Sequence, residues 1–275
     1  MLYQQPTVRP LADSELPLSV HAHHAWSGVS EKYAHVDTLD VVHALANVGI
    51  HPYLAKSSRT KLVSKVGYTK HMLRFRQDNQ QPLAGGIYPE VVIVNSHDRG
   101  SSFRADLGLY RLICKNGLVA NYGTLAAYRG IHVALRIEDV LAGVQNIIAQ
   151  FPRVVSVIEA MQRKTLNAEQ RTAFAQAAAL LRWDSDKLPF ESSVLLTTRR
   201  EEDSEPTIWN VFNAVQENLT QGQRIRTYGP SFSGYRRVTR STRAVGSIDV
   251  DMKINSGLWS LASELVNSKE VTATA

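Results

Sequence analysis

The sequence predicts an α+β fold, in which an antiparallel sheet is flanked by an N-terminal helix and a long helix and is followed by a helical C-terminal part. Three observations support this prediction. Residues 51–114 contain strand-like segments separated by turn residues. Apolar residues after position 137 recur every three or four residues, as on one face of a helix. Helix-capping residues then recur up to residue 267.

The N-terminal third divides into an arm and a first helix. Residues 1–35 are rich in Pro, Ser and His without periodicity, which indicates an irregular arm or cover. A helix over residues 38–48 follows, because Asp37 or Thr38 can cap it and Gly49 can end it in left-handed geometry. We assign the α+β core to residues 36–165 and the helical C-terminal region to 166–275.

Strand-like segments occupy residues 51–55, 69–77, 90–96 and 107–114, with a further candidate at 131–137. The connections at 77–86 and 96–100 are rich in turn residues, and Asn116-Gly117 is a pair that favours tight hairpins. Consecutive strands joined by short turns predict an antiparallel sheet.

The long helix begins near residue 137 and either kinks or stops and restarts at Pro152, because proline lacks a backbone donor. Asn167, with a glutamine three residues later, resembles a capping box and predicts a helix to about residue 182. Pro206 and Gly222 bracket another helix, and Asn255 can cap the last one.

Composition limits the class of protein. The 275 residues are 44% hydrophobic and 20% charged, which excludes wholesale disorder. The single cysteine, Cys114, cannot form an intrachain disulfide and is most simply a core residue. The N-terminus lacks a secretory pattern, and no apolar run approaches the ~20 residues of a membrane span. We therefore expect a cytoplasmic protein without membrane contact.

Positive charge is concentrated in two segments that contain no Asp or Glu, within a chain of formal net charge +6. Such segments favour polyanions, above all nucleic acid. The candidate nucleic-acid-binding cations of the first segment are Lys56, Arg59, Lys61, Lys65, Lys70, Arg74 and Arg76. Those of the second, between residues 221 and 247, are Arg224, Arg226, Arg236, Arg237, Arg240 and Arg243.

In the first segment, strand alternation places Lys70, Arg74 and Arg76 on one face and His71 and its alternate neighbours on the other. The cationic face suits a phosphate backbone. The alternative is an ordinary solvated sheet face, which antiparallel sheets often have.

The second segment interleaves aromatic residues with its arginines, among them Tyr228 and Tyr235, and contains several glycines. We interpret it as a mobile loop in which aromatic rings stack unpaired bases and guanidinium groups hold phosphates. The alternative is an exposed loop whose aromatic side chains pack against the rest of the protein.

Metal-ion and nucleotide sites find little support in the sequence. His21, His23 and His24 are close together, but a structural zinc site needs about four ligands and nothing completes the set. Asp249 and Asp251 would share a strand face, yet two carboxylates are a weak signal. Phosphate-binding-loop and dinucleotide-binding motifs are absent from the sequence. We predict no metal and no cofactor.

Ser96, His97 and Asp98 superficially offer a nucleophile, a base and an acid. Adjacent residues of an extended strand point to opposite faces, so a turn is the better interpretation. We predict no catalytic residues.

Three strings carry a resemblance to a known family: KHMLRFR at 70–76, PEVVIVNSHD at 89–98 and YRLICKNGLV at 110–119. They resemble the YafZ/YfjQ-type proteins of prophages and plasmids, a family with a domain of unknown function, over most of the chain. The resemblance implies a mobile-element setting and transfers no catalytic residue. Arg99 stands where the family tends to have glycine.

In element order alone, the predicted fold also resembles the single-strand annealing proteins of phage recombination, which is a fold-level analogy. We expect a non-enzymatic protein that binds single-stranded DNA or anneals it in recombination, as a homo-oligomeric ring or filament, with both basic segments in one groove. One alternative is a protein-interaction module that regulates element transfer or host defence. A second is a metal-dependent nuclease that uses Asp98, Asp249 or Asp251.

Overall fold

The computed structural model of the protein describes residues 9–30, 33, 35–83, 86–111, 116–119, 127–130, 136–231 and 234–268. Within 116–119, 127–130 and 226–238 the description is limited to the backbone. The chain forms two compact units, Met1–Val154 and Val155–Ala275. The division falls inside a helix, earlier than the expected end of the core at residue 165.

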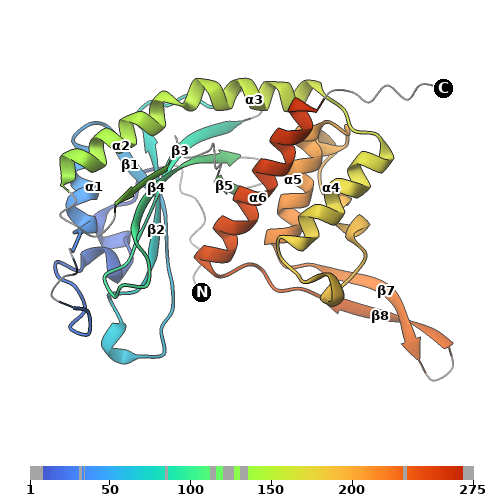
Figure 1. Cartoon of the computed structure of the whole chain (residues 1–275), viewed down its shortest axis with the longest axis horizontal. Helices are drawn as coiled ribbons and strands as arrows, with labels where there is room; N and C mark the ends of the chain where they lie inside the picture. The colour runs from blue at the N-terminus through green and yellow to red at the C-terminus, as the bar shows by residue number, and fades with distance from the viewer. Residues whose placement is uncertain are drawn as a thin grey trace. The chain divides into compact units, whose positions relative to one another are not determined.

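Unit 1 contains an antiparallel sheet, as predicted. Its strands β1 (Ile50–Ser57), β2 (His71–Gln77), β3 (Ile87–Asn95) and β4 (Phe103–Arg111) lie side by side in chain order (Figure 1). The short strands β5 (Asn116–Val119) and β6 (Ala127–Gly130) pair with the second and first halves of β4. Strands β2, β3 and β4 therefore each have a hydrogen-bonded neighbour on both sides.

Two helices of unit 1 pack together, α1 (Thr38–Ala46) next to β1 and α2 (Ile137–Ala149) next to β3 and β4. Asp37 caps α1 by accepting hydrogen bonds from Leu39 N and Asp40 N, and Gly49 follows with φ +74°. The predicted first helix and its caps are confirmed. Apolar residues from sheet and helices build the core, among them Leu45, Phe75, Ile93, Leu107 and Val144.

The N-terminal arm is an irregular cover with two 3-10 turns, η1 (Asp13–Glu15) and η2 (Leu18–His21). It buries Leu11, Leu16 and Val20. Backbone hydrogen bonds attach it to β1 and to the connection after β3: Leu11 N donates to Pro52 O at 2.7 Å, and Trp26 N donates to His97 O at 2.8 Å. The arm is therefore part of unit 1.

The long helix stops and restarts, because a turn at Gln150 separates α2 from α3 (Phe151–Arg163), with Pro152 in the first turn of α3. By length and composition the whole stretch Ile137–Arg163 could cross a bilayer, and 28% of its most apolar window is buried within the chain. A core helix can be equally long and apolar, and the buried residues of Ile137–Arg163 recur at helical spacing, as on the packed face of a core helix. The expectation of no membrane contact stays a prediction.

Unit 2 is built on α4 (Ala168–Leu180), α5 (Ile208–Thr220) and α6 (Ile248–Asn267), which pack on one another. The 3-10 turns η5 (Ser185–Lys187), η6 (Ser192–Leu196) and η7 (Glu201–Asp203) lie between α4 and α5. The predicted capping box is confirmed: Gln170 N donates to Asn167 Oδ1 at 2.8 Å and Asn167 N to Gln170 Oε1 at 3.0 Å. Phe212 and Trp259 meet edge to face in the core.

Several details differ from the sequence prediction. Ser247, and not Asn255, caps α6; Asn255 lies buried in its middle. Asp249 and Asp251 occupy the first turn of α6, so the shared strand face was wrong. Their charge is favourable there because a helix N-terminus is electropositive.

Two predictions near β5 also change. Asn116 and Gly117 are strand residues of β5, not a turn. Residues 131–135 of the candidate strand 131–137 lie outside the described residues, and Ile137 begins α2. Cys114 lies outside the described residues as well.

The basic C-terminal loop contains a two-stranded antiparallel ribbon, β7 (Arg224–Ser231) and β8 (Gly234–Ser241). Within unit 2 it extends away from the helices (Figure 1). Residues 224–231 and 234–241 of the expected mobile loop thus pair as strands, which β-branched residues such as Ile225, Thr227 and Val238 favour. Hereafter β7 and β8 are called the ribbon.

Candidate nucleic-acid interface

The cations of β2 are buried in a charged cluster on the sheet. The Nε atoms of Arg74 and Arg76 both donate to the carboxylate of Glu90 on β3, the second at 2.7 Å. The side chains of Arg74, Arg76 and Glu90 are 4%, 8% and 0% exposed. Arg74 Nη2 also donates to Leu109 O at 3.0 Å. Burial of these charges is tolerated because each has a partner of opposite sign.

Three tyrosines surround the Arg76 guanidinium, whose central carbon lies 4.8, 4.9 and 4.5 Å from the ring centroids of Tyr53, Tyr88 and Tyr110. Ring faces attract a cation, and the tyrosines therefore stabilise Arg76 beyond its ion pair. One Arg76 nitrogen, Nη2, is buried without a hydrogen-bond partner in the described part of the chain. The three rings therefore attract the positive charge of Arg76 where its guanidinium has no hydrogen-bond partner.

This cluster corrects the predicted exposed cationic strand face. Arg74 and Arg76 are internal ion-pair partners, because β3 brings Glu90 beside them. Lys56 is only 9% exposed and Lys70 is half-buried. A phosphate backbone could reach the two arginines only after the cluster opened.

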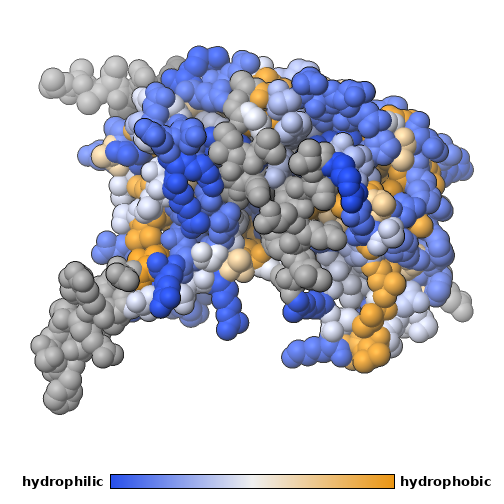
Figure 2. Space-filling model, turned by 180° about the vertical axis from the view of Figure 1, so that it is seen from behind, coloured by the Kyte–Doolittle hydropathy of each residue, from blue (hydrophilic) through white to orange (hydrophobic). Residues whose placement is uncertain are grey.

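The remaining cations of the first segment lie in the β1–β2 connection. Lys65 contacts Asp98 at 3.2 Å and lies 4.5 Å from the centroid of the Trp26 ring. Arg59 and Lys61 are exposed. Figure 2 shows hydrophilic and hydrophobic side chains side by side at the lower end of unit 1, where this connection lies. Arg59 and Lys61 are thus the accessible cations of this connection.

The root of the ribbon is fixed to α5 by backbone hydrogen bonds. Val245 N donates at 2.8 Å to the carbonyl of Thr220, the last residue of α5, and Thr242 N donates to Gln223 O at 2.9 Å, which joins the two ends of the ribbon. Gly222 is required there, since a Cβ atom would lie 2.9 Å from Thr242 O. The ribbon therefore starts from a defined position on unit 2.

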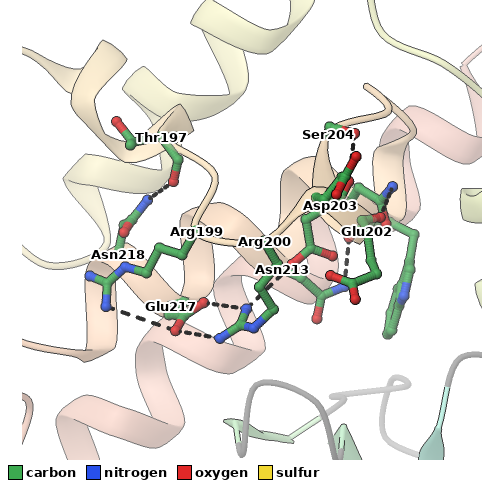
Figure 3. A network of polar contacts seen from close by, with 12 residues as sticks. Thr197, Arg199, Arg200, Glu202, Asp203, Ser204, Asn213, Glu217 and Asn218 are labelled. Carbon is green, nitrogen blue, oxygen red and sulfur yellow. Dashed lines mark hydrogen bonds and ion pairs between the residues drawn. The ribbon is translucent and has the colours of Figure 1, made fainter.

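Side chains reinforce that root. The Arg182 guanidinium at the end of α4 donates to the carbonyls of Leu219 and Arg243, on either side of the ribbon. The Arg200 guanidinium binds Glu217 of α5 in a two-pronged ion pair, at 2.7 and 2.8 Å (Figure 3). This pair ties the segment before α5 to the helix from which the ribbon emerges.

The same network includes Asn218, which donates to Leu195 O and Thr197 O at 2.8 Å each (Figure 3). Arg199 contacts the Glu217 carboxylate at 3.8 Å and donates to Gln221 Oε1 at 3.2 Å. Glu217 is 4% exposed, so these arginines neutralise a buried charge. We assign the network a structural role as the support of the ribbon.

The ribbon and the residues directly after it present arginines to solvent. Arg224, Arg240 and Arg243 are exposed. The register pairs position 226 with 239, 228 with 237, and 230 with 235. Because side chains alternate along a strand, positions 224, 226, 228, 235 and 237 share one face. The predicted site side chains of Arg226, Tyr228, Tyr235, Arg236 and Arg237 lie outside the described residues.

The two basic segments belong to different units, the first to unit 1 and the second to unit 2. Neither unit alone therefore contains the single groove that both segments were expected to form.

Sequence reasoning missed a buried histidine cluster beneath α1. The ring of His97 lies 4.6 Å from that of His35 and 5.2 Å from that of His71, centroid to centroid. Thr38 Oγ1 lies 2.9 Å from His71 Nε2 and 3.3 Å from His97 Nε2, and accepts from Asn95 Nδ2 at 3.0 Å. Asn95 pairs with His71 in the β2–β3 register, which a correct strand alignment could have revealed.

These histidines are held neutral. Burial lowers the pKa of His71 to about 4. Burial, and then the neighbouring rings of His71 and His35, lower the pKa of His97 to about 3. His71 Nδ1 lies 3.1 Å from Thr69 O and donates to it, which leaves Nε2 to accept the Thr38 hydroxyl proton. The cluster is a polar anchor between the sheet and α1.

The string Ser96-His97-Asp98 diverges, as expected of a turn. Ser96 Oγ donates to Ser101 O at 3.1 Å, His97 points into the histidine cluster, and Asp98 Oδ1 accepts from Gly100 N at 2.9 Å. Arg99 has φ +65°, a left-handed conformation that suits the glycine typical of the family. The three side chains therefore do not form a triad.

Among the described residues, groups of three or more His, Cys, Asp or Glu side chains arranged as metal ligands are absent. His23 contacts Asp37 at 2.7 Å, His24 contacts the Tyr68 hydroxyl at 2.8 Å, and His21 contacts Asp13 O at 3.1 Å. The three N-terminal histidines thus have separate partners.

Comparison with known proteins identifies the family. The model of the "Domain of unknown function (DUF932)" matches residues 25–259. The UPF0380 protein YafZ of Escherichia coli (strain K12) is 33% identical over 261 residues, covering 94% of this chain and 92% of that protein. The UPF0380 protein YfjQ of the same organism is 32% identical over the same shares. No solved structure matches. The resemblance seen in the sequence is confirmed, and this chain belongs to the DUF932 family.

Proposed function

We propose that this protein binds nucleic acid without catalysing a reaction on it, with the ribbon as its main contact and with a preference for single-stranded DNA. One observation carries the proposal. The segment 221–247 has no acidic residue, forms an antiparallel ribbon, and exposes Arg224, Arg240 and Arg243.

Charge and shape support this function together. Exposed arginines without nearby carboxylates bind phosphates and release counterions from the strand. Tyrosine positions 228 and 235 share a ribbon face with arginine positions 224, 226 and 237. Aromatic rings stack on unpaired bases, which favours a single strand over a duplex. A two-stranded ribbon also fits the major groove of duplex DNA, so the duplex is the comparison that the test requires.

A salt series tests the proposal. Binding of a fluorescent 30-nucleotide strand would be measured between about 50 and 300 mM salt, a range over which phosphate contacts weaken markedly. We expect Arg224→Ala/Arg226→Ala, which removes two arginines from the ribbon face that carries positions Tyr228 and Tyr235, to weaken binding. It should reduce the slope of log K against log salt by about 1.4, which corresponds to two lost contacts to a single strand.

The matched control is Arg153→Ala/Arg163→Ala, which removes two exposed arginines from α3. If binding depends only on net charge, both double variants will lose affinity equally, and the ribbon proposal fails. Absence of binding by the natural protein at low salt would refute nucleic-acid binding itself. Tighter binding to a duplex of equal length would refute the preference for single strands.

Annealing and assembly into a ring or filament belong to the same proposal, supported by the sheet-then-long-helix order of unit 1. Complementary strands carrying a donor and an acceptor dye would pair faster in the presence of the protein. Light scattering after size-exclusion chromatography would give the oligomeric state. A monomer that binds but does not accelerate pairing would restrict the function to binding.

A further inference from the structure

A cleft of about 300 Å³ lies in unit 1 between η2 and the two ends of the β1–β2 connection. Its polar lining consists of hydroxyl side chains and one guanidinium: Ser19, Ser57, Ser58, Thr60, Thr69 and Arg59. Hydroxyl groups and a guanidinium donate hydrogen bonds to anionic oxygens, and the lining contains no carboxylate to compete for them.

Two groups in this lining have hydrogen-bonding capacity to spare. The Ser19 hydroxyl is buried, with the residue 2% exposed, and has no hydrogen-bond partner in the described part of the chain. A turn about its χ1 toward the cleft would give it an acceptor and relieve that cost. The Thr60 hydroxyl accepts from Leu62 N at 3.1 Å and keeps its own proton to donate.

Arg59 is the charged member of the lining. It is exposed, and it takes part in no ion pair with another described residue. The whole stretch from residue 56 to 76 contains no acid. The Arg59 guanidinium is therefore available to an external anion, unlike those of Arg74 and Arg76.

Apolar side chains form the other wall. Leu18 and Val66 line the cleft and are 64% and 54% exposed. Leu62 and Val63 continue this apolar surface along the connection and are 57% and 86% exposed. The hydrophobic side chains at the lower end of unit 1 in Figure 2 lie in this region. Such a wall offers nothing to a bare phosphate ion but can contact a flat apolar ring.

We infer that this cleft binds one nucleotide, with its phosphate on Arg59 and the surrounding hydroxyls and its base against Leu18 and Val66. A volume of about 300 Å³ is at the lower end of small-molecule sites, which suits a single nucleotide. The choice of a nucleotide over another phosphate compound rests on the proposed function. The site itself lies in unit 1 and does not depend on the ribbon.

The test titrates thymidine 5′-monophosphate, thymidine and inorganic phosphate separately into the full-length protein, followed by NMR. Thymidine 5′-monophosphate is expected to bind more tightly than either part alone. Arg59→Ala should weaken it about tenfold, because a charge-assisted hydrogen-bond pair is lost. Lys61→Ala is the matched control: it removes an exposed cation of the same connection outside the cleft and should change binding less than about threefold.

Three results would overturn the inference: no saturable binding of the nucleotide, equal binding of inorganic phosphate, or equal effects of Arg59→Ala and Lys61→Ala. Repeating the comparison with a 30-nucleotide strand identifies the source of the nucleotide. A larger loss for Arg59→Ala than for Lys61→Ala places a unit of the strand in the cleft, and equal losses assign the cleft to a free nucleotide. A strand that binds only through the ribbon, without nucleotide binding, refutes this inference and leaves the proposed function intact.

Discussion

The β2 strand and the ribbon begin from the same sequence pattern and end in opposite environments. Both are built of strand residues that include two or more arginines and no acidic residue. In β2, Arg74 and Arg76 are buried against Glu90 and three tyrosines. In the ribbon, Arg224 and Arg240 are exposed. An acid-free stretch of sequence therefore does not by itself predict an accessible cationic surface.

The difference comes from the neighbouring strand in the sheet. Glu90 lies on β3, fourteen positions beyond Arg76 along the chain, and the sheet brings it beside both arginines. The ribbon has only two strands, and both belong to the acid-free segment. Charge pairing within a sheet depends on neighbours across strands, which a local charge count does not detect.

The largest expected effect is on the buried cluster. Glu90→Gln removes the carboxylate that two buried guanidinium groups share, and should lower the free energy of unfolding by about 3–5 kcal/mol. Urea unfolding at neutral pH measures it. A loss below about 1 kcal/mol, the value typical of an exposed pair, would show that Arg74 and Arg76 are solvated and would break the comparison.

Protonation gives the next largest effect. Both histidine pKa values are lowered in the folded state, to about 4 for His71 and about 3 for His97. Below the unfolded pKa of about 6.5, these histidines bind protons in the unfolded chain but not in the folded protein. The stability that the two neutral histidines contribute is therefore complete above that pH and is lost as the pH falls. Between pH 7 and 5 the free energy of unfolding should fall by about 3–4 kcal/mol for the two histidines together.

Urea unfolding at both pH values, followed by the Trp26 indole NMR signal of unit 1, checks this loss. His71→Gln should show about half the pH dependence, because one titrating group is removed. An unfolding free energy that stays constant between pH 7 and 5 would contradict burial of the cluster. The ribbon segment 221–247 contains no His, Asp or Glu, so its charge stays constant over the same range.

A smaller effect is expected at Gly108, which faces Glu90 in the β3–β4 register. A Cβ atom at this position would lie 2.5 Å from Val92 Cγ2 and 3.0 Å from Arg74 Nη2. Gly108→Ala should therefore destabilise the protein by about 1–3 kcal/mol through overpacking. Thermal unfolding measures it, and an unchanged midpoint would mean that the Val92 and Arg74 side chains can both shift to make room for a methyl group.

The smallest effect on stability is expected from the ribbon. Arg224→Ala/Arg240→Ala should change the free energy of unfolding by no more than about 0.5 kcal/mol, because exposed side chains contribute little. Urea unfolding of this variant beside Glu90→Gln gives the comparison directly. A loss of more than about 2 kcal/mol would mean that these arginines support the fold and are not free for a ligand.

The sequence predicted the α+β class, the main helices and the four long strands, because periodicity and capping are local properties. Asp37, Asn167 and Pro152 act as their positions indicated. It did not predict the Glu90 cluster or the histidines around Thr38, since both join residues of different strands and helices. The cleft at Arg59 was missed for the same reason: η2 forms one of its walls.

Arginine footprinting tests the central claim most directly. The free protein and its complex with a 30-nucleotide strand would be treated with phenylglyoxal, and modified arginines located by mass spectrometry. We predict that Arg224, Arg240 and Arg243 react in the free protein and are protected by the strand, whereas Arg74 and Arg76 react in neither state. Reactive Arg74 and Arg76 that the strand protects, with unchanged reactivity in the ribbon, would contradict the account.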